Sequence, residues 1–300
     1  ERAVSLGFKL NEYGVFKGEE RVAGRTEEEV YKALGLPWIP PELREDRGEI
    51  QAAEEGKLPK LVEPEQILGD LHVHTDWSDG KGSLEEMAKA AMELGYRYIA
   101  IVDHFRFAQA IPGLGPEELA RQMEAIQELN RKLKGFRLLS GIEANILPDG
   151  TIDVPRELLR ELEVVVAAIH THMRMPKKEM TKRLLSAIEN EDVDIIAHPS
   201  GRLIGERSAY DVDWEEVFRR AAKYGTILEV NANPQRLDLC AEHVREAIDT
   251  GVKLALGTDA HHPDHLWFMR YGILTARRGW AEAKDVINTL SLDKLLAMFK

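Results

Sequence analysis

The chain has 300 residues, of which 44% are hydrophobic and 31% are charged, a composition typical of a folded globular protein. It holds 40 lysines and arginines against 52 aspartates and glutamates, and the resulting net charge of −12 argues against non-specific nucleic-acid binding over the whole surface. No apolar run approaches the roughly 20 residues that a membrane-spanning helix needs. Cys240 is the single cysteine, so no internal disulfide forms, and we expect a cytoplasmic protein without a membrane partner.

Residues 1–45 predict a small α+β segment. Alternating aromatic and polar residues at 8–10 and 13–16 are typical of short strands, and residues 17–20 of a turn. A Thr-Glu-Glu-Glu capping box at residues 26–29 opens a short helix. This segment is too small to bury a core alone, so we expect it to be the remnant of a larger domain.

A charged connector covers residues 46–66, and a different pattern occupies residues 67–300, where short apolar runs alternate with longer amphipathic stretches. Strand–helix alternation of this kind is typical of a parallel sheet. A single block of this length favours a closed β/α barrel over an open doubly wound sheet, although an eighth strand is not evident. The seven predicted strands are 70–73, 98–102, 137–142, 164–169, 194–197, 226–230 and 253–256.

Helix signals lie between the predicted strands. Residues 83–86 form a capping box, and Pro116 occupies a favourable first-turn position. Asp213 begins a helix that Gly225 ends, and a further helix ends at Gly251. The pattern therefore predicts helices that connect successive parallel strands.

Side chains able to bind metal follow six of the seven predicted strands, at the end where barrel enzymes build their sites. A single histidine there is usually a hydrogen-bonded core residue, and a single acid is often a helix cap. The whole set does not fit that interpretation, because seven of the ten histidines lie at strand ends and each unpaired buried polar group costs about 1–3 kcal/mol. The residues are His72, His74, Asp76, Asp79, Asp103, His104, Glu143, His170, His172, His198, Asp259 and His261.

The donor types narrow the choice of ion. Mixed imidazole and carboxylate ligands suit Zn²⁺, Mn²⁺ or Fe²⁺. So many donors imply two or three ions, and a site of this kind is suited to phosphoester hydrolysis. Glu143 stands alone on its strand, which suits a carboxylate that bridges ions.

The same residues, in the same order, resemble the motifs of the polymerase and histidinol phosphatase (PHP) domain. They are His72-Val73-His74-Thr75, Ser78-Asp79-Gly80, Asp103-His104, Gly141-Ile142-Glu143, His170, Ala197-His198-Pro199 and Thr258-Asp259-Ala260-His261. The resemblance implies a distorted seven-stranded β/α barrel and a three-metal site, with Mn²⁺ as the expected activating ion. It implies as ligands His72, His74, Asp79, His104, Glu143, His170, His198, Asp259 and His261, and among these Glu143, Asp259 and His261 as catalytic residues.

A second resemblance links the N-terminal segment to family X DNA polymerases. Residues 7–14, 24–29 and 36–44 are similar to the end of that polymerase core, and residues 229–239 are similar to PHP domains fused to bacterial family X polymerases. The resemblance implies that the chain is the C-terminal part of such a polymerase, with the upstream polymerase domain as a partner. The nucleotidyltransferase carboxylates would lie upstream, so we do not expect this chain to polymerise DNA.

The two resemblances together imply a metal-dependent phosphodiesterase or phosphatase that acts on single-stranded or gapped DNA 3′ ends in repair. Its activities would be 3′→5′ exonuclease cleavage, with abasic-site and 3′-phosphate processing as related reactions. The alternatives are a small-molecule phosphatase of the histidinol-phosphate type and a non-catalytic scaffold for the polymerase. Candidates to bind the substrate phosphate, each equally compatible with a solvated surface charge, are Arg174, Lys177, Arg202, Arg207 and Arg236.

Overall fold

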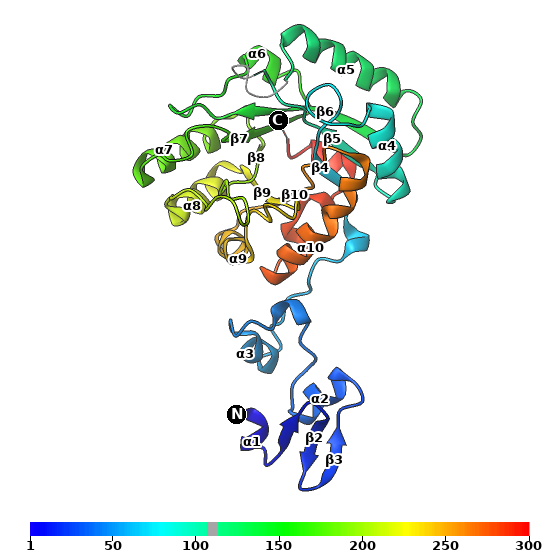
Figure 1. Cartoon of the computed structure of the whole chain (residues 1–300), viewed down its shortest axis with the longest axis vertical. Helices are drawn as coiled ribbons and strands as arrows, with labels where there is room; N and C mark the ends of the chain where they lie inside the picture. Colours follow the sequence, from blue (N-terminus) through cyan, green and yellow to red (C-terminus); the bar gives the residue numbers. More distant parts are fainter. Residues whose placement is uncertain (107–112, 300) are drawn as a thin grey trace. The chain divides into compact units, whose positions relative to one another are not determined.

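The structure, a computed structural model, describes residues 1–106 and 113–299. It divides into two compact units, Glu1–Lys60 and Leu61–Lys300 (Figure 1). Among the described residues, no helix is both long enough and apolar enough to cross a membrane.

The smaller unit contains a three-stranded antiparallel sheet and short helices. β1 (Lys9–Asn11), β2 (Gly14–Lys17) and β3 (Glu20–Ala23) pair in chain order. As predicted, Thr26 caps the next helix by accepting a hydrogen bond from the Glu29 N–H. The helical segments of this unit are α1 (Arg2–Ser5), α2 (Glu27–Ala33), η1 (Pro41–Leu43) and α3 (Glu49–Glu54).

The third strand of this unit was not predicted. Lys17 pairs with Glu20, so the turn contains only Gly18 and Glu19, and Glu20 already belongs to β3. Gly18 adopts a φ of +61°, which a tight two-residue hairpin turn favours. The side chains of residues 20–22 are all exposed, so β3 lacks the apolar alternation that marks a half-buried strand.

The larger unit is a nearly closed barrel of seven parallel strands, which confirms the predicted fold class (Figure 1). Neighbouring strands pair in chain order from β4 to β10, and every pairing is parallel. All seven predicted runs are strands. They are β4 (Gly69–Val73), β5 (Tyr98–Ile101), β6 (Arg137–Asn145), β7 (Val164–Ala168), β8 (Ile195–Ile196), β9 (Ile227–Asn231) and β10 (Leu254–Gly257).

Helices lie around the strands (Figure 1). Ser83 and Glu86 form the predicted capping box, and Gly225 and Gly251 end their helices in the left-handed conformation. The larger helical segments are α4 (Leu84–Glu93), α5 (Pro116–Asn130), α7 (Lys177–Ile188), α8 (Trp214–Tyr224), α9 (Ala241–Thr250) and α10 (Met269–Arg278). The short ones are η2 (Pro64–Gln66), α6 (Arg156–Leu159), η3 (Pro263–Phe268), η4 (Ala283–Asp285), η5 (Ile287–Thr289) and α11 (Leu292–Leu296).

The first and last strands of the barrel meet without a continuous ladder. One parallel bridge joins Val73 to Ala260. The fully buried Asn288 of η5 fills the gap, because its side-chain amide donates to the carbonyls of Gly69 on β4 and Leu256 on β10, at 2.9 and 2.8 Å. Its Oδ1 accepts the N–H of Leu256 at 2.7 Å. One side chain thus replaces part of the missing strand pairing.

Buried apolar residues from most strands pack into continuous clusters. In one of them Ala100 and Val166 pack with Ile287, Leu295 and Phe299 from the C-terminal segment. Polar residues are therefore the exception inside the barrel, and those expected to bind metal lie at or just after the carboxyl-terminal parts of the strands.

Candidate metal centre

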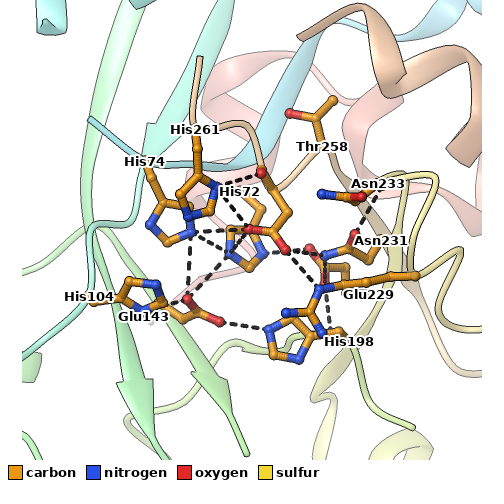
Figure 2. A network of polar contacts seen from close by, with 12 residues as sticks. His72, His74, His104, Glu143, His198, Glu229, Asn231, Asn233, Thr258 and His261 are labelled. Carbon is orange, nitrogen blue, oxygen red and sulfur yellow. Dashed lines mark hydrogen bonds and ion pairs between the residues drawn. The ribbon is translucent and has the colours of Figure 1, made fainter. Parts of the chain in front are cut away.

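The nine expected ligands converge at the carboxyl ends of the strands. Figure 2 shows His72, His74, His104, Glu143, His198 and His261 close together. His72 lies on β4 and Glu143 on β6, and the others lie in the loops that follow β4, β5, β7, β8 and β10. Burial is close to complete for most of them: His72, His74, Glu143 and His198 expose 2% or less of their surface. Because water cannot reach most of these polar side chains, their burial has to be compensated by contacts with one another or with bound cations.

Glu143 lies at the middle of the cluster. Its Oε2 is 3.0 Å from His104 Nδ1, and its Oε1 is 3.2 Å from His170 Nε2 and 2.9 Å from His198 Nε2. Oε2 is also 3.6 Å from the Nε2 atoms of His72 and His74. Both carboxylate oxygens therefore face imidazole nitrogens, which is the arrangement expected of a carboxylate that bridges two ions.

Three groups of side chains could each hold one ion. In each group the ligand atoms lie within 4.8 Å of one another, and His74 and His104 belong to two groups each. His261 Nε2 is 3.3 Å from Asp79 Oδ1, and His74 Nε2 is 3.4 Å from Asp259 Oδ1. The groups are His74, Asp79, His104 and His261; His72, His74 and Asp259; and His104, Glu143 and His170.

The cluster passes a test of fit for divalent cations. His72 Nε2 and His74 Nε2 are 3.0 Å apart, and both face Asp259 Oδ1 and Glu143 Oε2. Four ligand-type atoms from three parts of the chain thus point at the same small volume. In addition, the buried Nδ1 atoms of His74 and His198 have no hydrogen-bond partner within the described residues. Mixed imidazole and carboxylate donors suit transition metals better than Mg²⁺ or Ca²⁺.

The protonation states of His74, His198 and Glu143 agree with a role as metal ligands. Burial lowers the pKa of His74 to about 3 and, together with the charge of Arg236, that of His198 to about 4, so both rings are neutral at pH 7. Burial alone would raise the pKa of the Glu143 carboxyl, but the surrounding imidazoles of His170 and His104 lower it well below its usual range. Metal ligands need neutral imidazole and ionised carboxylate.

Two ligands are oriented by polar side chains behind them. His72 Nδ1 is 2.7 Å from Glu229 Oε1, and His170 Nδ1 is 2.6 Å from Asn145 Oδ1. Asn145 in turn donates from Nδ2 to Asp153 at 2.6 Å. Such contacts fix which ring nitrogen carries the proton and which can face the cluster.

A buried arginine ties two of these strand ends together. Arg183 of α7, only 1% exposed, donates to the carbonyls of Ile146 and Thr171, with Nε 3.1 Å from the first and Nη1 3.0 Å from the second. These residues directly follow Asn145 and His170. The guanidinium therefore holds the two backbones beside the hydrogen bond that orients His170.

Buried carboxylates that are not in the ligand set stabilise the loops instead. Asp70 accepts the N–H groups of His72 and Thr258, each at 3.1 Å. Asp103, a metal-competent residue in the sequence, accepts hydrogen bonds from Thr75 and from Gln122 Nε2, the latter at 2.6 Å. Sequence reasoning missed Asp70 and Glu229, and the available signal was an acid in the middle of an otherwise apolar strand.

The five basic candidates for phosphate binding are placed differently from one another. Arg236 Nε lies 3.0 Å from Asp259 Oδ2, so this guanidinium is at the cluster. Arg202 donates to the carbonyls of Arg236 and Leu237, and Arg207 donates to that of Gly201. Arg174 and Lys177, in the loop after His172 and at the start of α7, are exposed.

Comparison with known proteins agrees with the geometry. The family model of the PHP domain matches residues 70–233, more than half of the chain. The chain belongs to the PHP family, whose members are metal-dependent phosphoesterases. The model of the DNA polymerase beta thumb matches residues 1–45. Both resemblances inferred from the motifs are thereby confirmed.

Relatives of the PHP chain include polymerases and phosphatases. It is 44% identical over 300 residues to the DNA polymerase/3′-5′ exonuclease PolX of Bacillus subtilis, and the match covers 99% of the chain but 52% of that protein. The chain thus spans about half the length of this relative. It is 32% identical over 207 residues to a "Probable phosphatase" of Caldanaerobacter subterraneus, covering 65% of the chain and 77% of that protein.

A solved structure shares the fold. The histidinol phosphate phosphatase of Lactococcus lactis, crystallised with zinc, L-histidinol and phosphate, matches with a TM-score of 0.51 at 15% sequence identity. The match covers 72% of the chain and 95% of that structure. At this identity the likeness shows the barrel fold alone.

Proposed function

We propose that this PHP chain is a phosphodiesterase and phosphatase that acts on DNA 3′ ends, with 3′→5′ exonuclease cleavage as its main activity and abasic-site and 3′-phosphate processing as related reactions in repair. One observation carries the proposal: a convergent set of eight metal-competent side chains, with His198 against Glu143 as a ninth, lies in the same chain as a segment that matches a polymerase thumb. A DNA substrate implies a cytoplasmic enzyme that works beside the polymerase part of a longer protein.

The ligand set would hold two or three divalent ions, Mn²⁺ or Zn²⁺ with Fe²⁺ as a further candidate. Such ions supply Lewis acidity to a phosphoryl group and charge for the leaving oxygen. Glu143, Asp259 and His261 would keep the ions in position, because each faces more than one other ligand.

Arg236 is the basic residue best placed to orient a phosphate. Its side chain is 19% exposed, and its Nε is held by Asp259. Within the described residues, the terminal nitrogens of this guanidinium have no hydrogen-bond partner, so they can donate to a non-bridging oxygen in a fixed direction. Arg202 would not contact the phosphate but would position Arg236, because it donates a hydrogen bond to the carbonyl of Arg236.

Two other functions remain as alternatives. A small-molecule phosphatase is suggested by the fold shared with histidinol phosphate phosphatase, but the thumb-like residues 1–45 favour DNA. A non-catalytic scaffold would not need a full set of convergent ligands.

The test is hydrolysis by the 300-residue chain loaded with Mn²⁺. Single-stranded oligonucleotides labelled at the 5′ or 3′ end, an oligonucleotide with a 3′-phosphate and one with an abasic site would be compared with histidinol phosphate. We expect stepwise shortening from the 3′ end and release of 3′-phosphate. Glu143→Gln should lower kcat/KM by more than about 100-fold, the upper range for losing even an outer partner of a metal site.

The matched control is Glu246→Gln, because Glu246 is an exposed glutamate on α9. Turnover of histidinol phosphate alone would replace the proposal by the small-molecule phosphatase. Fewer than two transition-metal ions per chain by elemental analysis, together with no turnover of any substrate, would identify a scaffold.

A further inference from the structure

A group of aromatic side chains, of which Trp267 is exposed and the others are half-buried, begins four residues after His261. Trp267 exposes 40% of its surface at the end of η3, and its ring centroid lies 5.9 Å from that of Phe268 and 5.5 Å from that of Tyr271. His265 stacks on Phe268 at 4.9 Å with an interplanar angle of 19°. We call this group the aromatic patch; it comprises His265, Trp267, Phe268, Arg270 and Tyr271.

The patch carries a positive charge on its aromatic faces. The guanidinium carbon of Arg270 lies 3.4 Å from the ring centroid of Trp267 and 4.8 Å from that of Tyr271. Arg270 Nη2 donates to the Tyr271 hydroxyl at 3.0 Å, and Arg270 is itself exposed. A flat cation held against one exposed and one half-buried ring is a surface to which a nucleobase can stack while a phosphate pairs with the charge.

The patch is continuous with the metal centre. His265 Nδ1 accepts the N–H of His261 at 3.4 Å, and the His261 ring stacks on that of His74 at 4.3 Å. One extended residue, His262, and the first four residues of a 3-10 segment rising about 2 Å per residue separate His261 from Trp267, so the two lie within about 15 Å of each other. A strand of a few nucleotides can span this distance.

The loop after β4 brings a second positively charged residue next to His261. Lys81 is exposed, and its N–H donates to the His261 carbonyl at 2.8 Å. The side chain of His261 is 30% exposed, so this part of the cluster is open to a substrate. Lys81 and Arg270 are thus two exposed cationic residues on segments that adjoin His261, in a chain whose overall charge is −12.

We infer that the aromatic patch binds the unpaired bases of single-stranded DNA next to the nucleotide being cleaved. The inference rests on the proposed function and deepens it, because stacking requires bases that are not paired in a duplex. Tryptophan, tyrosine and arginine are also common at protein interfaces. Continuity with a phosphoester-cleaving site favours the nucleic acid, since a polymer held at His261 has to continue over a neighbouring surface.

The test is a double-mutant cycle between one ring and one group of bases. Dissociation constants would be measured by fluorescence anisotropy for the Mn²⁺-loaded chain and an oligothymidylate whose 3′ linkages are phosphorothioates that resist hydrolysis. The same oligonucleotide with abasic residues near its 3′ end completes the cycle. We expect Trp267→Ala to weaken binding of the complete oligonucleotide by about 5- to 100-fold, the range for one stacked base.

In the cycle, abasic residues should weaken binding to the wild-type chain but have little further effect on Trp267→Ala. Trp267→Phe should restore most of the affinity, because it keeps a ring. Arg270→Met should reduce the salt dependence of binding by about one counterion. Tyr224→Ala is the matched control: Tyr224 is 46% exposed under the charge of Lys223, but it lies at the end of α8, next to the start of β9.

Independent, additive effects of Trp267→Ala and of the abasic residues would overturn the inference. A concentration-dependent rise in sedimentation coefficient that Trp267→Ala abolishes, without coupling to the bases, would also overturn it and identify a contact between copies of the chain. Shortening of 3′-labelled DNA by the wild-type chain would be followed in parallel. If that fails, the proposed function fails; if it succeeds without coupling, only the role of the aromatic patch fails.

Discussion

His72 and Glu229 are 157 positions apart in the sequence, yet His72 Nδ1 lies 2.7 Å from Glu229 Oε1 (Figure 2). The other oxygen of Glu229 accepts the N–H of His198 at 2.6 Å. His72, His198 and Glu229 are all buried. One carboxylate on β9 therefore turns Nε2 of His72 toward the metal cluster and fixes the loop that carries His198.

Glu229→Gln should weaken metal binding by about 10- to 100-fold while the barrel stays folded. The glutamine amide can donate to His72 Nδ1, which would place the ring proton on Nε2, the atom that faces the cluster. The measurement is titration of the metal-free chain with Mn²⁺, followed by electron paramagnetic resonance of the free ion. Equal affinities in Glu229→Gln and in the exposed control Glu246→Gln would contradict the positioning role.

Removing the cations should lower the melting temperature. Without them the carboxylates of Asp79, Glu143 and Asp259 stay together in a largely buried cluster with imidazoles and Arg236 beside them. A ligand at 100 times its Kd adds about 2.7 kcal/mol to stability. With a shift of about 2–4 °C per kcal/mol for a domain of this size, chelation should lower Tm by about 5–10 °C.

Calorimetry of the wild-type chain with Mn²⁺ and with excess chelator measures that shift. Asp259→Asn should show a much smaller difference between the two conditions, because it removes one of the carboxylates that bind the ions. Identical melting temperatures for the wild-type chain in both conditions would show that the cluster binds no ion with useful affinity.

The barrel was predictable from sequence because its signals are local. Each strand is a short apolar run, and helix caps such as Ser83 and Asp213 lie within three residues of the groups they pair with. The positions of the metal-competent residues were predictable for a related reason, since all of them lie late in such runs or just after them, and parallel strands end at one face. β3 was missed because its side chains give no alternation.

Residues that act over long sequence separations were not predictable in the same way. Glu229 and Asn288 look like isolated polar residues, and their partners lie 157 and 219 positions away. Among the basic candidates, the sequence could not separate Arg236, which contacts Asp259, from Arg202, which binds backbone carbonyls. Only the closed barrel brings those groups together.

Asp238 should make stability depend on pH. Burial raises the pKa of its carboxyl to about 6, although the N–H of Ser200 and the charge of Arg202 oppose the shift. Below about pH 4 the group is protonated in both states; between about pH 4 and pH 6 only the unfolded chain releases its proton, so the free energy of unfolding falls as pH rises. The loss should reach at most about 3 kcal/mol.

Asp238→Asn should remove this part of the pH dependence, even if the substitution lowers stability at every pH. Urea unfolding of the metal-free wild-type chain and of metal-free Asp238→Asn, each at about pH 4.5 and about pH 7, shows how strongly the free energy of unfolding of each chain depends on pH. Asp211→Asn, at an exposed aspartate, serves as the control. Parallel pH profiles for Asp238→Asn and the wild-type chain would mean that Asp238 ionises at its ordinary pKa in the fold.

Asn288 should contribute more to stability than its size suggests, because it closes the barrel. Asn288→Leu has a similar volume but leaves the Gly69 carbonyl and both backbone groups of Leu256 without their partner, at a cost of about 1–3 kcal/mol for each buried group. We expect a loss of at least about 3 kcal/mol in urea unfolding.

In Asn288→Asp an ionised carboxylate can accept from the Leu256 N–H but cannot donate to the two carbonyls, whereas a protonated carboxyl can donate to one of them. The stability of Asn288→Asp at neutral pH should therefore lie between those of Asn288→Leu and the wild-type chain only if the carboxyl is protonated. Lys294→Ala, at an exposed position on α11, should change stability by less than about 0.5 kcal/mol. If Asn288→Leu is as stable as Lys294→Ala, the contacts between β4 and β10 hold the barrel closed without the amide.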